Sequence, residues 1–512
     1  MVDFSKYFKG NKDREYPDKQ YREDKYIDGN LDDMMLDIEN RRYLVPKIEP
    51  LSSEVKDFKL TDEFKKTFDL IENSKQHVFI TGKAGCGKST FLKYFRENTK
   101  KNIVVLAPTG IASINVKGQT IHSFFQFPIT FIDKNKIHYI SDKHNIFTTI
   151  KTLVIDEVSM VRADLLDAID ISLRLNNFKK DVPFGGIQIV MIGDLFQLSP
   201  VVENQLRGYF DKMYRSPFFF DAKVMKEIDL KMVELTKIFR QDDPVFIELL
   251  NKIRENKVGV GDLNKLNIKC FYDRIDEEEE KKQKLSIYLT ATNAKANEIN
   301  QMHLDAIQEP EFEYIAEITN QFDKASYPTD EILVLKKGSQ VMMIRNDTPL
   351  KRWVNGSIGI VTYLDNEGIC VKFEDGREFY IEKFMWEKIE YVFSRKNVNT
   401  GIEENTGEID ARVIGTFEQY PIRLSWAVTV HKSQGKTFDN INIDSGWGMF
   451  AHGQLYVALS RARKLEGIRF ETPIKAKDII FDKRVNEFFR QVNIKKEIGT
   501  VKPSFILFQE EE

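Results

Sequence analysis

A glycine-rich segment, placed between an apolar strand and a helix, constrains the fold of this chain more than any other feature. The segment Gly82-Lys-Ala-Gly-Cys-Gly-Lys88-Ser89 fits the pattern G-x-x-x-x-G-K-[ST]. HVFITG (77–82) predicts a short strand before it, and STFLKYFRENTK (89–100) predicts a helix after it. Glycines let backbone N–H groups wrap phosphates, and the N-terminus of a helix favours anions. The segment therefore predicts a P-loop nucleotide-binding domain of the α/β class.

This loop supplies the first expected site residues. Lys88 is expected to neutralise the β- and γ-phosphates of ATP, and Ser89 is expected to bind Mg²⁺. The residues of the segment expected to contact ATP are Gly82, Ala84, Gly85, Cys86, Gly87, Lys88, Ser89 and Thr90. ATP and Mg²⁺ are therefore the expected cofactors.

Polar residues at the ends of two further apolar strands extend this site. In Leu153-Val-Ile-Asp156-Glu157, Asp156 is expected near Mg²⁺, and Glu157 can accept a proton from an attacking water molecule. In Gly193-Asp-Leu-Phe-Gln197, the glutamine suits a sensor of the γ-phosphate, although an ordinary strand-to-loop turn explains this segment equally well.

Hydrolysis also needs cations on the charge that develops at the γ-phosphate, and arginine fingers typically add roughly 10³–10⁵ in rate. Arg240 in ELTKIFRQ and Arg461 in YVALSRAR are the candidates for this catalytic role. An arginine in a chain of 512 residues is more often a surface residue, so position alone does not identify either of them.

Apolar strands that alternate with helices organise most of the chain. KNIVVLAP (101–108), TLVIDE (152–157) and QIVMIGD (188–194) are apolar almost throughout, as in parallel strands that are buried on both faces. LTDEFKKTFDLIENS (60–74) predicts a capped amphipathic helix. SIYLTATN (286–293) and residues 421–470 return to the same pattern, so we predict two α/β domains with parallel sheets.

Residues 333–381 follow a different pattern. Short apolar strands are separated by the turn signals Asn355-Gly356, Glu367-Gly368 and Asp375-Gly376, which predicts a small β-barrel inserted within the second α/β domain. Helices are also predicted over 31–45 and around 243–256. The charged run DEEEEKKQK (276–284) is expected to be a solvated loop or helix end.

Composition excludes several classes of protein. Hydrophobic residues make up 42% and charged residues 30%, a balance that supports a sizeable core. No run of about 20 apolar residues occurs and the N-terminus is charged, so neither a membrane span nor secretion is expected. Three widely spaced cysteines exclude a disulfide framework and favour a reducing compartment, so we expect a cytoplasmic protein. The net charge of −3 excludes a uniformly basic nucleic-acid binder, but it does not exclude a local basic groove.

Three segments carry residue types that suit a single strand of nucleic acid. They are Pro108-Thr109-Gly110, Gln119-Thr-Ile-His122-Ser123-Phe124 and Thr429-Val-His431-Lys432-Ser433-Gln434. Hydroxyls and backbone amides suit phosphates, whereas His and Phe can stack on bases at about 1–3 kcal/mol per base. Packing in the core is an equal alternative for His122 and Phe124.

These motifs, in this order, resemble the superfamily-one 5′→3′ DNA helicases, and more specifically the petite-integration-frequency (Pif) family, with RecD and Dda as more distant relatives. PFGGIQ (183–188) resembles a signature of the Pif family itself. The motifs that carry the resemblance lie between residues 60 and 470 and read VFITGKAGCGKST, VLAPTGIASINVKGQTIHSFF, LVIDEVSM, PFGGIQIVMIGDLFQLSPV, ELTKIFRQ, YLTATNAKANEIN, WAVTVHKSQGKTFD and LYVALSRAR.

The resemblance implies two RecA-like domains around one ATP, with an inserted small β-barrel and a small wedge insertion. The residues between 124 and 151 can form this wedge at a duplex fork, and a variable surface insertion is the alternative. The implied boundaries are an N-terminal extension over 1–55, a first RecA-like domain over 56–225, a second over 226–332 and 416–500, the barrel over 333–415 and a C-terminal tail over 501–512.

The resemblance also implies roles for matching residues. Arg240 and Arg461 are the arginines contributed from the opposite domain, and Gly435 lies where the second domain approaches the nucleotide. Relatives often carry a glutamine before the phosphate loop that reads the adenine, and Phe64 stands there in this chain, which puts base selectivity in doubt. The implied contacts to DNA are Pro108, Thr109, Gly110, His122, Ser123, Phe124, Thr290, Asn293, His431, Lys432 and Ser433.

The implied activity is ATP-dependent unwinding of DNA by a protein that moves 5′→3′ on single-stranded DNA and is expected to be a monomer in solution. Tailed duplex DNA is the expected substrate, with RNA–DNA hybrids or G-quadruplexes as further substrates, and the direction of movement rests on the resemblance alone. Two alternatives stay open. One is a nucleotide-switched ATPase that binds single strands without unwinding, and the other is an RNA helicase with the same chemistry.

Overall fold

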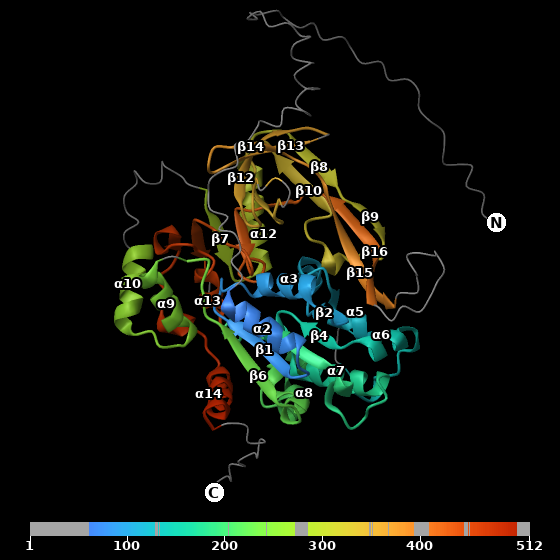
Figure 1. Ribbon diagram of the computed structural model, residues 1–512. Helices are drawn as coiled ribbons and strands as arrows, with labels where there is room; N and C mark the ends of the chain where they lie inside the picture. Colours follow the sequence, from blue (N-terminus) through green and yellow to red (C-terminus); the bar gives the residue numbers. More distant parts are fainter. Residues whose placement is uncertain are drawn as a thin grey trace, which may run out of the picture. The chain divides into compact units, whose positions relative to one another are not determined.

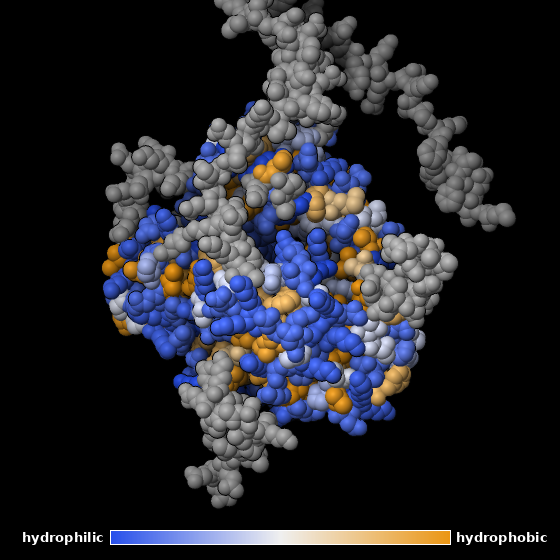
Figure 2. All heavy atoms as spheres, viewed as in Figure 1, coloured by the Kyte–Doolittle hydropathy of each residue, from blue (hydrophilic) through white to orange (hydrophobic). Residues whose placement is uncertain are grey.

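The computed structural model describes residues 61–498, apart from 129–131, 133, 203, 242, 272–284, 348–349, 351, 367, 394–408, 445–448 and 450. The N-terminal extension, the helix predicted over 31–45, the charged run 276–284 and the tail 501–512 lie outside the described residues. Among the described residues no helix has the length and apolar character needed to cross a membrane. Hydrophilic side chains predominate on the face shown in Figure 2, between smaller apolar patches.

The first lobe is built on a six-stranded parallel sheet with the order β3-β2-β4-β5-β1-β6 (Figure 1). Four central strands are buried at nearly every residue, because helices cover both faces of such a sheet. The strands are β1 His77–Gly82, β2 Ile103–Ala107, β3 Gln119–Thr120, β4 Thr152–Ile155, β5 Gln188–Ile192 and β6 Leu230–Leu235. The helices are α2 Asp62–Glu72, α3 Lys88–Asn98, α4 Gly110–Asn115, α5 Ile121–Phe125, α6 His144–Thr149, α7 Ala163–Asn176 and α8 Asn204–Met213.

Helix α2 shows how local sequence sets these elements. Thr61 caps it, because its hydroxyl accepts a hydrogen bond from the backbone N–H of Phe64 at 3.2 Å, and two acidic residues occupy the first turn. Phe64, Thr67 and Ile71, spaced three and four residues apart, form its buried face. The predicted helix over 60–74 is confirmed.

The second lobe holds a smaller parallel sheet with the order β18-β7-β19-β20. Its strands are β7 Ile287–Thr290, β18 Ala427–Thr429, β19 Ile441–Asp444 and β20 Ile468–Phe470. Its helices are α9 Pro244–Arg254, α10 Val260–Cys270, α12 Asn293–Ala306, α13 Gln454–Leu459 and α14 Lys483–Ile498. Two α/β lobes with parallel sheets confirm the predicted fold class.

An antiparallel β module interrupts the second lobe between β7 and β18. The all-β prediction for 333–381 is confirmed, since five strands lie there and the pairs β11–β12–β13–β14 are antiparallel. The strands of the module are β8 Glu311–Ile315, β9 Glu317–Asn320, β10 Ile332–Lys336, β11 Gln340–Met343, β12 Ile358–Leu364, β13 Ile369–Phe373, β14 Glu378–Ile381, β15 Phe384–Phe393, β16 Ile409–Gln419 and β17 Ile422–Leu424.

The pairing of strands corrects three predicted domain boundaries. The strand β6 pairs with β1, so the first lobe continues to Leu235 and does not end at 225. The strands β8 and β9 pair with β10 and β16, and β17 pairs with β11. The inserted module therefore runs from Glu311 to Leu424 and exceeds the predicted 333–415 at both ends, because hydrogen bonding between distant strands decides membership.

A long hairpin of the module, β15 and β16, reaches the first lobe. The hydroxyl of Tyr391 accepts a hydrogen bond from Val105 N at 3.1 Å, and Lys143 Nζ lies 3.4 Å from Glu390 Oε1. Lys143 belongs to the segment predicted as a wedge, where Ile146 and Phe147 are buried in the core of the first lobe. The described part of that segment is therefore packed against both the first lobe and the hairpin, and its role at a fork stays a prediction.

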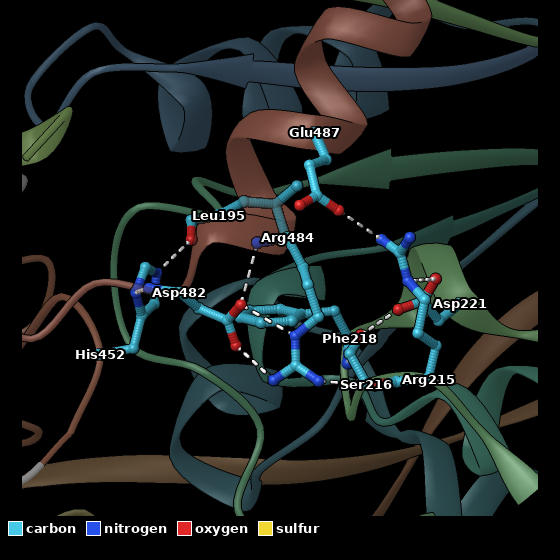
Figure 3. A network of polar contacts seen from close by, with 9 residues as sticks. All are labelled: Leu195, Arg215, Ser216, Phe218, Asp221, His452, Asp482, Arg484 and Glu487. Carbon is cyan, nitrogen blue, oxygen red and sulfur yellow. Dashed lines mark hydrogen bonds and ion pairs between the residues drawn. The ribbon is translucent and has the colours of Figure 1, made fainter. Parts of the chain in front are cut away.

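The helix α14 returns from the second lobe to the first. The ring of Phe488 stacks on Phe220 with centroids 4.6 Å apart, and that of Phe489 stacks on Phe196 at 5.1 Å. Figure 3 shows the polar contacts near the start of this helix, where Glu487 lies 3.2 Å from Arg215 of the first lobe. Aromatic packing and ion pairs thus join the lobes at a second place.

Candidate nucleotide site and nucleic-acid interface

The phosphate loop lies between β1 and α3, as the sequence predicts. Its backbone requires glycine, since Gly85 has φ +80° and a Cβ there would lie 2.5 Å from Arg240 Cβ. Lys88 is the first residue of α3, and its Nζ donates hydrogen bonds to the carbonyl oxygens of Gly82 at 2.7 Å and Lys83 at 3.1 Å. The loop therefore wraps around the ammonium group at the helix N-terminus, the place where phosphates bind in such loops.

The two predicted carboxylates follow β4 directly. Burial raises the pKa of Asp156 to about 6. Burial, and then the neighbouring Asp156, raise the pKa of Glu157 to about 7, while Lys88 and Arg461 act in the opposite direction. Glu157 also has a left-handed backbone, with φ 49° and ψ 42°, a conformation that costs of order 1–3 kcal/mol and often marks a functional site. This arrangement suits a general base whose proton affinity lies near neutral pH.

Gln197 lies in the loop after β5 and donates a hydrogen bond to Asp194, which forms an ion pair with Arg254. Its Nε2 donates to Asp194 Oδ2 at 3.2 Å, and Asp194 Oδ1 lies 3.2 Å from Arg254 Nη2. Both charged side chains are almost completely buried, and the Arg254 guanidinium lies 3.9 Å from the centroid of the Phe196 ring. Arg254 ends α9 in the second lobe, so the opposite lobe fixes the predicted γ-phosphate sensor.

Both predicted arginines lie at this junction. Arg240 Nη1 donates to Ser460 O at 3.2 Å, and Arg461 Nε donates to Val457 O at 2.9 Å. Arg461 is only 1% exposed, and burial together with nearby Arg240 lowers its pKa well below the usual value. A buried cation that faces Glu157 has the placement expected of a group that binds a γ-phosphate.

Other side chains of the second lobe contact the same elements. The hydroxyl of Tyr456 accepts a hydrogen bond from Ala84 N in the phosphate loop at 3.0 Å. Gln434 Nε2 lies 3.2 Å from Glu157 Oε2 and 3.2 Å from Gln197 Oε1. The structure thus brings the predicted ATP-binding residues of both lobes to one place, including Gly435 beside Gln434.

Four functional candidates at this place are not predicted from the sequence: Tyr456, Gln434, Asp194 and Arg254. Tyr456, Gln434 and Asp194 lie inside the helicase-like motifs LYVALSRAR, WAVTVHKSQGKTFD and PFGGIQIVMIGDLFQLSPV, so their motifs carried a signal. Arg254 ends an ordinary amphipathic helix and has no local signal, because only tertiary packing places it on Asp194.

The residues present fit a magnesium ion. Ser89 offers a hydroxyl and Asp156 a carboxylate, and Mg²⁺ prefers a few such oxygens together with water and substrate phosphates. The buried Asp156 has Lys88 as the neighbouring cation that favours its charged form. No cluster of three or more His, Cys, Asp or Glu side chains suited to a metal occurs in the part of the chain that the structure describes.

Phe64 is a core residue. Its ring packs edge-on against Phe91 with centroids 5.4 Å apart, and 1% of its surface is exposed. The position expected to hold an adenine-reading glutamine therefore stabilises the packing of α2 on α3 instead.

The predicted DNA-contacting residues divide by exposure. Thr109, Asn293 and Lys432 are exposed, and the partly exposed members are Pro108, Gly110, His122, Ser123 and His431. For these eight residues, contact with DNA stays a prediction.

Three members of the set have buried side chains, which excludes stacking on a base by Phe124 in this structure and leaves contact of Thr290 and Ser433 with DNA a prediction. Phe124 is 0% exposed and packs against Phe125 and Phe147, so it cannot stack on a base. The hydroxyls of Thr290 and Ser433 donate to the carbonyl oxygens of Thr292 at 3.0 Å and Val430 at 2.7 Å. These two side chains stabilise local turns.

The inserted module covers part of the first-lobe loop expected to bind the strand. A Cβ at Gly110 would lie 2.2 Å from Ser326 Oγ, which shows how closely residues 324–326 approach this loop. Elsewhere in the module, Arg423 of β17 lies near Lys432 and Lys436 of the second lobe. Burial, together with the positive charges of Arg423 and Lys432, lowers the pKa of Lys436 to about 7. Arg423 and Lys436 are thus further basic residues near Lys432, which is predicted to contact DNA, and the sequence does not predict either of them.

Comparisons with known proteins agree with this arrangement. A model of the PIF1-like helicase family matches residues 59–262, and a model of the UvrD-like helicase C-terminal domain matches residues 424–466. The ATP-dependent DNA helicase Pif1 of Bdellovibrio bacteriovorus is 31% identical over 85% of this chain and 93% of its own length. The mouse ATP-dependent DNA helicase PIF1 is 30% identical, and the match spans 57% of that longer protein.

Solved structures of Pif1 from a Bacteroides species are also similar. The complex with ADP-AlF4 is 40% identical, with a TM-score of 0.77 over 86% of this chain and 98% of that one. The complex with single-stranded DNA is 39% identical, with a TM-score of 0.59 and the same coverage. From its motifs, its two lobes and this similarity along most of its length, the chain belongs to the PIF1-like helicase family.

Proposed function

We propose that this protein is an ATP-dependent DNA helicase that moves 5′→3′ on single-stranded DNA and unwinds duplex DNA. One observation carries the proposal. The phosphate loop and carboxylates of one lobe face the buried Arg461 of the other lobe across a single junction, and the half-buried Arg240, which follows β6 beside the loop, donates hydrogen bonds across the same junction. A nucleotide bound at the loop would link the lobes, and its hydrolysis would release that link.

The chemistry follows from the residues at the junction. A water molecule attacks the γ-phosphorus, one of its protons passes to a carboxylate oxygen of Glu157, and the bond to the bridging oxygen breaks, which releases ADP and phosphate. The positive charge for the transferred phosphoryl group comes from Lys88, Arg240 and Arg461. Gln434 donates hydrogen bonds to both Gln197 and Glu157 and so links the γ-phosphate sensor to the proton acceptor. Mg²⁺, when bound by Ser89 and Asp156, supplies further neutralisation of the phosphates.

Movement along DNA requires that both lobes hold the strand. Thr109 in the first lobe and Lys432 in the second are exposed and follow parallel strands of their sheets. Alternate grip by these two surfaces, as the junction closes and opens, would advance the strand. The relatives are named DNA helicases, and the solved Bacteroides Pif1 complex contains single-stranded DNA, which supports DNA as the partner.

Strand displacement tests the proposal directly. With ATP and Mg²⁺, the protein should displace a strand from a duplex with a 5′ single-stranded tail and not from one with a 3′ tail. Active ATP hydrolysis without displacement from either duplex would contradict the proposal and leave a nucleotide-switched binding protein. Stimulation of the ATPase by RNA alone would instead identify an RNA helicase. Light scattering of the free protein should show a monomer in solution.

A further inference from the structure

One side chain of the second lobe donates hydrogen bonds to both groups of the first lobe that would face the attacking water. The amide nitrogen of Gln434 lies 3.2 Å from Glu157 Oε2 and 3.2 Å from Gln197 Oε1. We propose that Gln434 is a positioning residue, which holds the proton acceptor and the γ-phosphate sensor in register when the two lobes are together. This inference rests on the proposed ATPase function.

The backbone around Gln434 is fixed by the same arginines that face the nucleotide site. Arg461 Nη1 donates to Ser433 O at 3.4 Å and to Lys436 O at 3.3 Å. Arg240 Nη2 donates to Gly435 O at 3.4 Å. The carbonyl groups on both sides of Gln434 are thus held, so the side chain has a defined direction toward the first lobe.

A side-chain amide suits this position chemically. Its NH2 group carries two protons, so one nitrogen can donate to two oxygens at once. The two hydrogen bonds fix the direction of the Glu157 carboxylate and of the Gln197 amide relative to each other. A methionine of similar size would fill the space without donating.

The charged groups that face Glu157 come from several elements. Lys88 begins α3, Asp156 and Asp194 follow β4 and β5, and Arg461 follows α13. Two of these neighbours are cations and two are carboxylates, so the amide lies in a balanced electrostatic setting. An ionised carboxylate in place of Gln434 would add a third negative neighbour and would remove the donor of both hydrogen bonds.

The test compares Q434M and Q434E with a matched control, Q301E, on the exposed surface of α12, where Gln301 Nε2 donates to Asp305 Oδ1 at 2.8 Å. Steady-state ATPase is measured with saturating single-stranded DNA at neutral pH. Because a hydrogen bond to a charged group is worth about 1.5–3 kcal/mol, Q434M should lower kcat about ten- to a hundred-fold at neutral pH. The KM for ATP and the Kd for DNA should stay within about twofold of the wild type.

Q434E distinguishes positioning from mere packing. An ionised glutamate has nearly the size of glutamine but can only accept hydrogen bonds, so kcat in Q434E should fall at least as far as in Q434M while the KM for ATP stays within about twofold of the wild type. A kcat within about threefold of wild type in either variant would overturn the inference, and so would a KM for ATP that rises in step with the fall in kcat. If K88A abolishes turnover in the same assay, the proposed function survives that result. A wild-type protein without DNA-stimulated ATPase would contradict the proposed function instead.

Discussion

At the scale of single residues, burial separates side chains of the same type into different roles. Arg461 and Glu157 are costly to bury as ions, and each gains partners from across the junction of the lobes. Phe64 and Phe124 are buried among other aromatic rings and contribute packing. Their motifs suggest nucleotide or DNA contact, but a phenylalanine beside an apolar strand serves the core equally well, and only the structure decides.

The raised pKa of Glu157 makes the stability of the protein depend on pH. Its folded pKa of about 7 exceeds its usual 4.5, so the folded state holds a proton that the unfolded state releases in this window. Stability from this group is therefore present below pH 4.5 and is lost as pH rises to about 7. E157Q, which cannot ionise, should raise the free energy of unfolding above pH 7 by at most about 3 kcal/mol and have little effect at low pH.

Chemical denaturation of the wild type and E157Q without nucleotide or Mg²⁺ checks this prediction. The difference in the free energy of unfolding between the two proteins should grow as pH increases from 4.5 to about 7. A difference that is the same at acid and alkaline pH would show that Glu157 does not carry a raised pKa.

Phe124 should behave as a core residue. F124A removes a fully buried ring and should cost about 3–5 kcal/mol of unfolding free energy, while the affinity of the folded protein for single-stranded DNA stays unchanged. F178A is the matched control, because that ring is 68% exposed and should cost little. A stable F124A protein with weakened DNA binding would restore the stacking role that the structure contradicts.

At the scale of elements, regular buried strands can be predicted from the sequence, whereas contacts between the lobes cannot. The parallel strands of both lobes are predicted because they are apolar at nearly every position. The strands β8 and β9 are mostly exposed, so their pattern gives little signal, and their pairing partners lie up to about a hundred residues away. The loop after β5 is predicted as a sensor, whereas its anchor on α9 needs tertiary structure.

The ion pair between Asp194 and Arg254 should hold that loop. R254A leaves the Asp194 carboxylate buried without its cation, which typically costs about 3–5 kcal/mol. Because Gln197 donates to Asp194, ATP turnover should fall as well. Unfolding by denaturant and steady-state ATPase measure the two effects. The double variant R254M/D194N should recover stability without recovering turnover, and recovery of both would show that the pair does not position Gln197.

At the scale of the whole molecule, the fold connects two lobes through several independent contacts. Tyr456, Gln434 and the arginines meet at the nucleotide site, α14 packs back on the first lobe, and the β15–β16 hairpin reaches it from the inserted module. The site residues of each lobe are predictable from local motifs. Their meeting across the junction is not, since no local pattern encodes the approach of two domains.

The measurement that tests the central claim most directly is the ATPase and nucleotide affinity of R461A. Arg461 belongs to the lobe opposite the phosphate loop, so the account predicts nucleotide binding close to that of the wild type and a loss of DNA-stimulated turnover of roughly 10³-fold or more. Turnover near the wild-type rate would contradict the claim that one nucleotide is hydrolysed between two lobes.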